Sequence, residues 1–265
     1  MKPSPLYKNI ETGIVLDSTE AATYKGIAIK TLIFLAFNLV GALGMYFVLP
    51  QLIGSGDSAS SRWLVGALVA VSIASILAVI FGLLGRFIPR LAKVFGSIYS
   101  FCIGLVIGTL TTIVDHYLIR FAGLICITGT LIIFGVMLLL FATGVVKPSA
   151  KLKAIVLGIL IAGLLLTIAT LIFGIVLNVR NITGSINGWS ISAYLGLCIG
   201  VEVFFLLYGV ITLTFNFCEA QAVVTSGASK DAEWTVALGM EISLVYIYVE
   251  LLRILVLIAS LVDRR

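Results

Sequence analysis

The sequence has 265 residues, of which 61% are hydrophobic and only 11% are charged, and its mean hydropathy is +1.21. Soluble globular chains carry roughly 25% charged residues, so this composition excludes an ordinary soluble domain. The net charge of +5 is scattered over short polar segments without interleaved aromatic residues, and it therefore does not indicate nucleic-acid binding. We predict an all-α polytopic membrane protein whose main partner is the lipid bilayer.

Long apolar windows bounded by charged and turn residues predict seven transmembrane helices. Each window is long enough to cross a hydrocarbon core of ~30 Å. Residues 1–26 are expected to form a cytoplasmic N-terminal tail, and residues 27–265 a single seven-helix transmembrane domain. The predicted helices span residues 27–53, 63–88, 93–114, 120–145, 153–179, 190–217 and 235–262.

Short polar segments are expected to connect these helices, among them Asp115-His116 and the stretch from Glu219 to Glu233. With the N-terminus in the cytoplasm, eleven Lys and Arg residues lie on the inner side and five on the outer side. This asymmetry favours that orientation, because basic residues in short loops remain cytoplasmic. The four cysteines occur singly, without the spacing of a zinc site or a disulfide framework.

Three glutamates fall inside predicted helices, where a charged side chain costs about 2.5–3.5 kcal/mol on insertion scales. Glu202 lies in the sixth predicted helix, and Glu241 and Glu250 lie in the seventh. Glu250 has Arg253 three residues later, so a local ion pair that anchors helix packing is its simplest interpretation. Glu241 and Glu202 have no such neighbour. Each is either part of a water-filled, proton-sensitive pathway or a protonated glutamate hydrogen-bonded between helices.

Asn216 is expected to close the sixth helix, about where the antiparallel seventh helix brings Glu241. The two side chains are therefore predicted to meet near the cytoplasmic mouth. Gly104-x-x-x-Gly108 predicts a close approach between two helices. Gly54-Ser55-Gly56-Asp57 spells the GxGD pattern of intramembrane aspartyl proteases, but it falls in an expected loop, where Asp57 is read as a solvated turn residue.

The most specific pattern lies near the C-terminus. Residues 227–234 read Gly-Ala-Ser-Lys-Asp-Ala-Glu-Trp, and residues 245–255 read Val-Tyr-Ile-Tyr-Val-Glu-Leu-Leu-Arg-Ile-Leu. Together they resemble the last hairpin of the bacterial branch of the Bax-inhibitor/YccA-like family, the transmembrane Bax inhibitor motif proteins. Further upstream, Tyr24-Lys25-Gly26 with Lys30-Thr31 resembles the start of that family's first helix, and Pro89-Arg90-Leu91-Ala92 resembles its junction into the third.

This resemblance implies the Bax-inhibitor fold, with seven helices and a central last helix, in a bacterial cytoplasmic membrane. It also implies activities described as pH-sensitive calcium leak, modulation of stress or cell death, and interaction with a membrane-bound protease. The family's acid at the end of helix six is Asn216 here, its second acid two positions on is Cys218, and its acid in helix three is Ile103. A carboxylate latch would therefore pair an amide with Glu241, with Arg86 or Arg90 as possible basic partners.

We expect a pH-modulated calcium leak whose ion pathway and pH sensor involve Glu241, Asn216 and Glu202. The alternative is a non-conducting stress regulator that binds a membrane protease or another membrane protein. An enzyme is not expected, because the sequence has neither GxSG nor HExxH. A transporter built of inverted repeats is disfavoured by an odd number of spans. No cofactor and no metal site are predicted.

Overall fold

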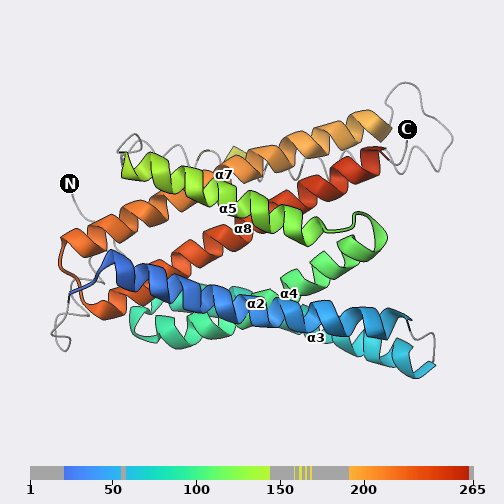
Figure 1. The fold of residues 1–265 in the computed structure, drawn as a ribbon, viewed down its shortest axis with the longest axis horizontal. Helices are drawn as coiled ribbons and strands as arrows, with labels where there is room; N and C mark the ends of the chain where they lie inside the picture. Colours follow the sequence, from blue (N-terminus) through green and yellow to red (C-terminus); the bar gives the residue numbers. More distant parts are fainter. Residues whose placement is uncertain are drawn as a thin grey trace. The chain divides into compact units, whose positions relative to one another are not determined.

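The computed structural model describes residues 21–54, 58–143 and 191–262, together with single positions between 158 and 168. Within these ranges the chain is helical, and its one β feature is an isolated bridge between Ala21 and Ser229. Six of the described helices are long and apolar enough to cross a membrane. In chain order (Figure 1) the elements are α2 (Tyr24–Gly54), α3 (Ser58–Phe87), the 3-10 turn η1 (Pro89–Leu91), α4 (Ala92–Tyr117), α5 (Ala122–Ala142), α7 (Ile191–Thr225) and α8 (Lys230–Val262).

The predicted helix at 153–179 lies outside the described residues. The predicted loop from Glu219 to Glu233 is wrong, and so is the expectation that Asn216 closes a helix. Helix α7 continues to Thr225 and α8 already begins at Lys230. The connection between them is short because Gly227 adopts a positive φ of 66°, which lets the chain reverse directly. Polar residues in this stretch suggested a loop, but Glu219 and Glu233 are both held within helices by ion pairs.

The predicted loop at Asp115-His116 is also helical, because both residues belong to the last turn of α4. Tyr46 of α2 donates its hydroxyl to Asp115 Oδ2 at 3.2 Å, which gives this acid a partner without leaving the helix. The polar pair thus marks the end of a helix rather than a loop.

The chain divides into two compact units, which are described separately. The first takes its residues from Met1–Tyr117 and Phe215–Val245, and the second from Leu118–Thr214 and Tyr246–Arg265. Helices α7 and α8 therefore each contribute one end to each unit.

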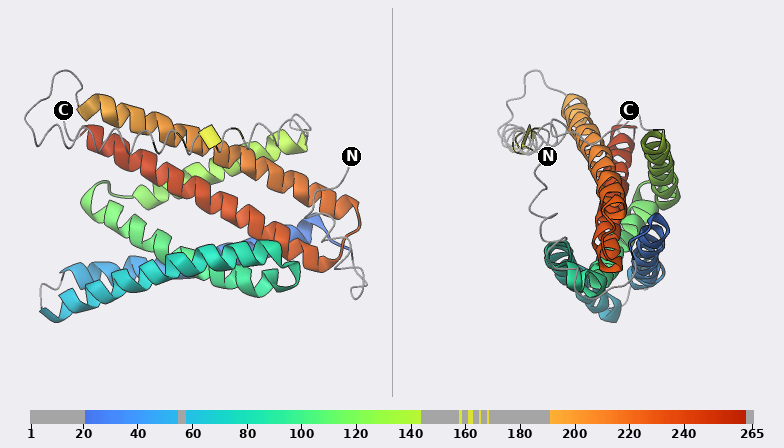
Figure 2. Two further views of the ribbon diagram at one scale, coloured as in Figure 1. Left: turned by 180° about the vertical axis from the view of Figure 1, so that it is seen from behind. Right: turned by 90° about the vertical axis from the view of Figure 1, so that its left-hand side faces the viewer.

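In the first unit α2, α3 and α4 lie side by side, as both views in Figure 2 show. Two glycines of α4 permit this close contact. A Cβ on Gly104 would collide with the carbonyl oxygen of Asn38, and one on Gly108 with that of Ala42. The predicted close approach at this glycine pair is therefore confirmed, with α2 as the partner.

The α8 segment of this unit is enclosed by its neighbours. Ala237 and Leu238 are fully buried in a cluster with Phe34, Ala78 and Tyr99, which come from α2, α3 and α4. Helix α7 contacts the same segment through hydrogen bonds from Asn216. Within this unit, α8 thus contacts α2, α3, α4 and α7.

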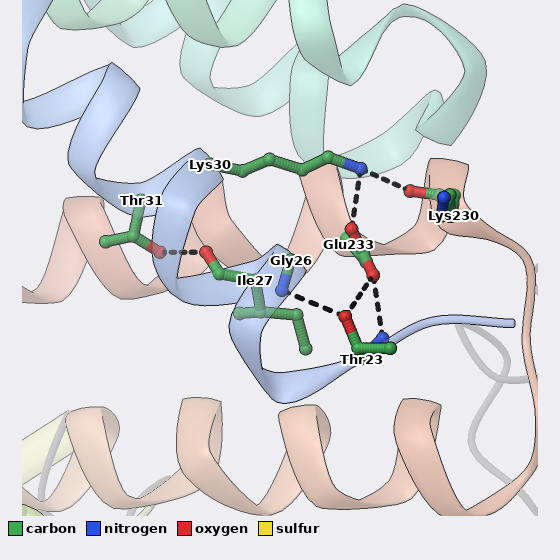
Figure 3. A network of polar contacts seen from close by, with 7 residues as sticks. All are labelled: Thr23, Gly26, Ile27, Lys30, Thr31, Lys230 and Glu233. Carbon is green, nitrogen blue, oxygen red and sulfur yellow. Dashed lines mark hydrogen bonds and ion pairs between the residues drawn. The ribbon is translucent and has the colours of Figure 1, made fainter.

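The start of α2 is fastened to the start of α8 by a buried carboxylate (Figure 3). Glu233 is 2% exposed, and its Oε2 lies 2.8 Å from Lys30 Nζ. Its Oε1 accepts a hydrogen bond from the backbone N–H of Thr23 at 2.7 Å, and Lys30 Nζ also donates to the Lys230 carbonyl at 2.6 Å. A backbone bond from Ala22 N to Ala228 O at 2.7 Å continues the junction.

This junction works like a capping box whose carboxylate comes from another helix. Thr23 caps α2, since its Oγ1 accepts the N–H of Gly26 at 3.0 Å. In a capping box the residue at the Gly26 position would be a Glu or Gln that bonds back to the capping N–H. Here Glu233 of α8 makes that bond, and a Cβ on Gly26 would occupy the space of its carboxylate. The glycine therefore makes room for the capping group.

In the second unit, α5 and the complementary ends of α7 and α8 come together. Gly209 of α7 faces Tyr246, and a Cβ there would lie 2.7 Å from the ring. The Tyr208 and Tyr246 rings meet edge to face with centroids 5.9 Å apart. Gly129 of α5 faces Leu251 of α8. Glycines on α5 and α7 thus leave space into which large side chains of α8 pack.

Candidate functional site

Glu241 is the most deeply buried of the three predicted intramembrane acids. It lies in the part of α8 that belongs to the first unit and is 0% exposed. Ser100 Oγ of α4 lies 2.6 Å from Glu241 Oε2, within hydrogen-bond distance. Tyr99 of α4 and Asn38 of α2 also lie close enough to interact with the carboxyl group. Three helices therefore meet around one acid.

The polar atoms around Glu241 are incompletely satisfied. Glu241 Oε1 and Asn38 Nδ2 are both buried without a hydrogen bond among the described residues. Among the residues that the structure describes, no Lys or Arg lies within ion-pair distance of Glu241. A buried carboxylate with neither a cation nor a full set of donors is costly.

Asn216 of α7 binds the backbone and side chain on either side of Glu241 along α8. Its Nδ2 donates to the Gly239 carbonyl at 2.9 Å and to Ser243 Oγ at 2.6 Å. Both amide hydrogens are thereby used, and within the described residues neither reaches the Glu241 carboxyl group. Asn216 therefore holds the helix segment that carries Glu241 and does not bind the acid itself.

Arg86, at the end of α3, pairs with an acid that sequence reasoning did not single out. Its Nη2 lies 3.1 Å from Glu219 Oε2 on α7. The guanidinium also lies against Gly239, where a Cβ would displace it. Arg90, the other predicted basic residue, lies in η1. The structure thus brings Arg86, Asn216 and Gly239 together one helical turn from Glu241.

The remaining two predicted acids form a separate group in the second unit. Arg253 Nη1 lies 3.6 Å from Glu250 Oε1 and 3.7 Å from Glu202 Oε2. Glu250 is buried, whereas Arg253 is half exposed, so one accessible cation serves two acids. Glu202 and Glu241 belong to different units.

Sequence reasoning missed three residues of the first unit: Ser100, Glu219 and Glu233. Glu219 and Glu233 were assigned to a loop, although each lies in a window that continues an apolar helix. Arg86 and Lys30, which lie near the ends of other predicted spans, are the signal that could have suggested that Glu219 and Glu233 remain helical. Ser100 gives no signal in sequence, because a serine on a membrane helix usually bonds its own backbone.

Among the described residues no group of three or more His, Cys, Asp or Glu side chains is arranged to hold a metal ion. The sequence model of the family described as Bax inhibitor 1 like matches residues 5–260, essentially the whole chain. The chain belongs to this family. No match was found among curated proteins or among solved structures. Family membership and six membrane-capable helices together make this Bax inhibitor 1 like protein an integral membrane protein.

Two of the segments that carried the resemblance in sequence contact each other in this Bax inhibitor 1 like protein. The stretch beginning at Tyr24 and the stretch 227–234 meet in the junction around Glu233. The capped start of α2 thus explains four residues of these segments, Gly26, Lys30, Lys230 and Glu233. The Glu241 cluster lies further along α8, two turns from Glu233.

Proposed function

We propose that this protein is a pH-modulated cation leak pathway, with calcium as the permeant ion and Glu241 as the group that binds the controlling proton. The observation that supports this most directly is the number of protons available at Ser100. Its hydroxyl lies 2.7 Å from the Gly96 carbonyl and 2.6 Å from Glu241 Oε2. A serine hydroxyl has one proton and can donate to only one of these oxygens.

Both short contacts are hydrogen bonds at the same time only when the Glu241 carboxyl is protonated. Ser100 then donates to Gly96, and Glu241 donates to Ser100 Oγ. When Glu241 loses its proton, one contact loses its hydrogen and a bare carboxylate stands among buried helices without an ion-pair partner in the described residues. Such a charge is stabilised only by admitting water or a cation, or by rearrangement. Deprotonation therefore favours an open pathway, and protonation a closed one.

The test is calcium flux into proteoliposomes at pH 6, 7 and 8. The natural chain should show flux that rises with pH. Glu241→Gln keeps a side-chain donor for Ser100 and cannot ionise, so its flux should be low and independent of pH. Glu202→Gln, which changes an acid in the other unit, is the control and should keep the pH response. A pH response that survives in Glu241→Gln would contradict the proposal.

The second candidate is a non-conducting stress regulator that binds a membrane protease or another membrane protein. One observation favours it. The α7–α8 contact beside Glu241 is made by the amide of Asn216, which does not titrate and whose two hydrogens are both bonded to α8. Folded, reconstituted protein that shows no calcium flux at any pH would decide for this candidate.

We propose that the N-terminus faces the cytoplasm of a bacterial cytoplasmic membrane. Basic residues gather at one end of the first unit, which the positive-inside bias would place in the cytoplasm. A reporter that is active only in the cytoplasm, fused before residue 1, should be active, and an inactive fusion would reverse the orientation. The basic residues at this end are Lys25, Lys30, Arg86, Arg90, Lys93 and Lys230.

A further inference from the structure

The junction between α2 and α8 is bordered by a groove that the proposed leak does not use. The groove is open and holds about 350 Å³. Its size is near the lower end of the ~300–1,000 Å³ range of ligand pockets. The residues that give it its chemical character are Lys25, Ile29, Lys30, Ile33, Lys230 and Trp234.

The charge of the groove is positive. Three lysines and one carboxylate line it, and the carboxylate, Glu233, already lies 2.8 Å from Lys30 Nζ and accepts the N–H of Thr23. Lys25 and Lys230 are exposed at its mouth. Lys30 Nζ lies 4.8 Å and Lys93 Nζ 5.6 Å from the centroid of the Trp234 ring. Lys93 is therefore a fourth cation close to the groove. An anion is the ligand that this distribution fits.

The groove changes from cationic to apolar along α2. Lys25, Ile29 and Ile33 follow one another at intervals of four residues, so they lie on one face of the helix. Ile29 is 47% exposed and Ile33 is 38% exposed, although both line the groove. A ligand with a charged head and an apolar tail would meet the lysine first and the isoleucines next.

The position of the groove relative to the membrane spans points the same way. One span runs over Tyr24–Gln51 and another over Lys230–Val262. Lys25 and Lys230 lie in the first turns of these spans, and Lys30 lies in the second turn of the first. Because both spans begin beside the groove, we expect its mouth at the level of the lipid headgroups and Ile29 and Ile33 further along the span, toward the acyl chains. Tryptophan is enriched at this interface, and basic pockets between membrane helices bind anionic headgroups.

We infer that the groove between α2 and the start of α8 binds an anionic phospholipid, with the phosphate between Lys25 and Lys230 and an acyl chain along Ile29 and Ile33. Trp234 lies beside the bound lipid and can report its presence. A free phosphate would use only the lysines and leave the apolar half of the groove empty.

The chain has three tryptophans, so Trp63→Phe with Trp189→Phe leaves Trp234 as the sole indole fluorophore. In detergent micelles this protein is titrated with brominated phosphatidylglycerol or brominated phosphatidylcholine, whose bromines quench a tryptophan that they contact. The anionic lipid should quench Trp234 at a lower lipid fraction. Lys25→Gln and Lys230→Gln should each raise the half-quenching fraction about fivefold, as expected for one interfacial lysine.

Arg120→Gln is the matched control, because it removes one exposed cation from the other unit. It should leave the preference for phosphatidylglycerol unchanged. Equal quenching by the two lipids, or an equal effect of Arg120→Gln, would overturn the inference. So would loss of the preference on adding millimolar inorganic phosphate, since that outcome assigns the groove to a free anion.

Native mass spectrometry of the natural chain is the second measurement, and it does not depend on the tryptophan substitutions. Phosphatidylglycerol should remain bound at collision energies that remove phosphatidylcholine, and this difference should disappear in Lys25→Gln with Lys230→Gln. Retention of both lipids to the same energy would contradict the inference. Neither readout involves ion flux, so the result is independent of the proposed leak.

Discussion

Glu233 and Glu241 lie two turns apart on α8, and both are almost completely buried, yet their surroundings differ. Glu233 has a lysine at 2.8 Å and a backbone donor at 2.7 Å. Glu241 has one serine hydroxyl at 2.6 Å, and its Oε1 has no hydrogen bond among the described residues. The first acid is compensated as an anion, whereas the second is bonded in a way that also accommodates a neutral carboxyl group.

The comparison shows that burial alone does not identify a functional acid in a membrane protein. What separates the two sites is the number of charges and donors that face each carboxyl group. The Glu233 region should therefore respond to substitution through stability, and the Glu241 region through its dependence on pH.

The largest effect is expected from Lys30→Met, which leaves Glu233 buried without its cation. Breaking a buried ion pair from one side costs about 3–5 kcal/mol. Thermal unfolding in detergent micelles should show this loss, and adding Glu233→Gln should restore much of it, because no uncompensated charge then remains. Lys93→Met is the control, since it removes another lysine that faces Trp234. Strictly additive effects of Lys30→Met and Glu233→Gln would refute the pairing.

An intermediate effect is expected from Gly104→Ala. The new methyl group would collide with the backbone carbonyl of Asn38, which cannot move without shifting α2. Overpacking of this kind costs about 1–3 kcal/mol in unfolding free energy. Gly44→Ala on α2 meets nothing within 4 Å and should be neutral or slightly stabilising. The same unfolding measurement compares the two, and equal stabilities would mean that α2 and α4 are not in close contact.

The smallest effect on stability is expected from Ser100→Ala. It removes the hydroxyl that contacts both the Gly96 carbonyl and Glu241 Oε2. A neutral hydrogen bond contributes about 1 kcal/mol. It also removes the group that links the Glu241 proton to the backbone of α4, so the pH dependence of calcium flux should weaken or shift. Ser97→Ala is the matched control. Ser97 makes the same bond to a carbonyl four residues back, at 2.8 Å, but it is only half-buried and bonds no acid among the described residues. Identical pH profiles for both variants would remove Ser100 from the mechanism.

The helical class and six of the spans could be predicted from sequence, because the length of an apolar window is a direct consequence of bilayer thickness. The ends were less predictable at Glu219 and Glu233. Charges near a helix end normally mark a loop, and only their partners on α3 and α2 explain why they remain helical. Such partners are distant in sequence and leave no local pattern.

The site shows the same division between local and distant information. The Glu250–Arg253 contact follows from a spacing of three residues on one helix. That Arg253 also reaches Glu202 required the packing of α7 against α8. Glu241 was singled out because an acid in a membrane span is costly, but Ser100 could not have been, since nothing near it in sequence indicates an acid from α8.

The bond from Thr23 to Glu233 joins residues 210 positions apart. A membrane protein is inserted as it is synthesised, so α2 enters the bilayer long before the acid that completes its capping box exists. Until the ribosome has passed Glu233, Lys30 and the backbone N–H of Thr23 depend on water or lipid for partners. Assembly of the first unit therefore finishes only with the final hairpin, and a chain truncated before it would expose an incompletely capped helix to cellular quality control.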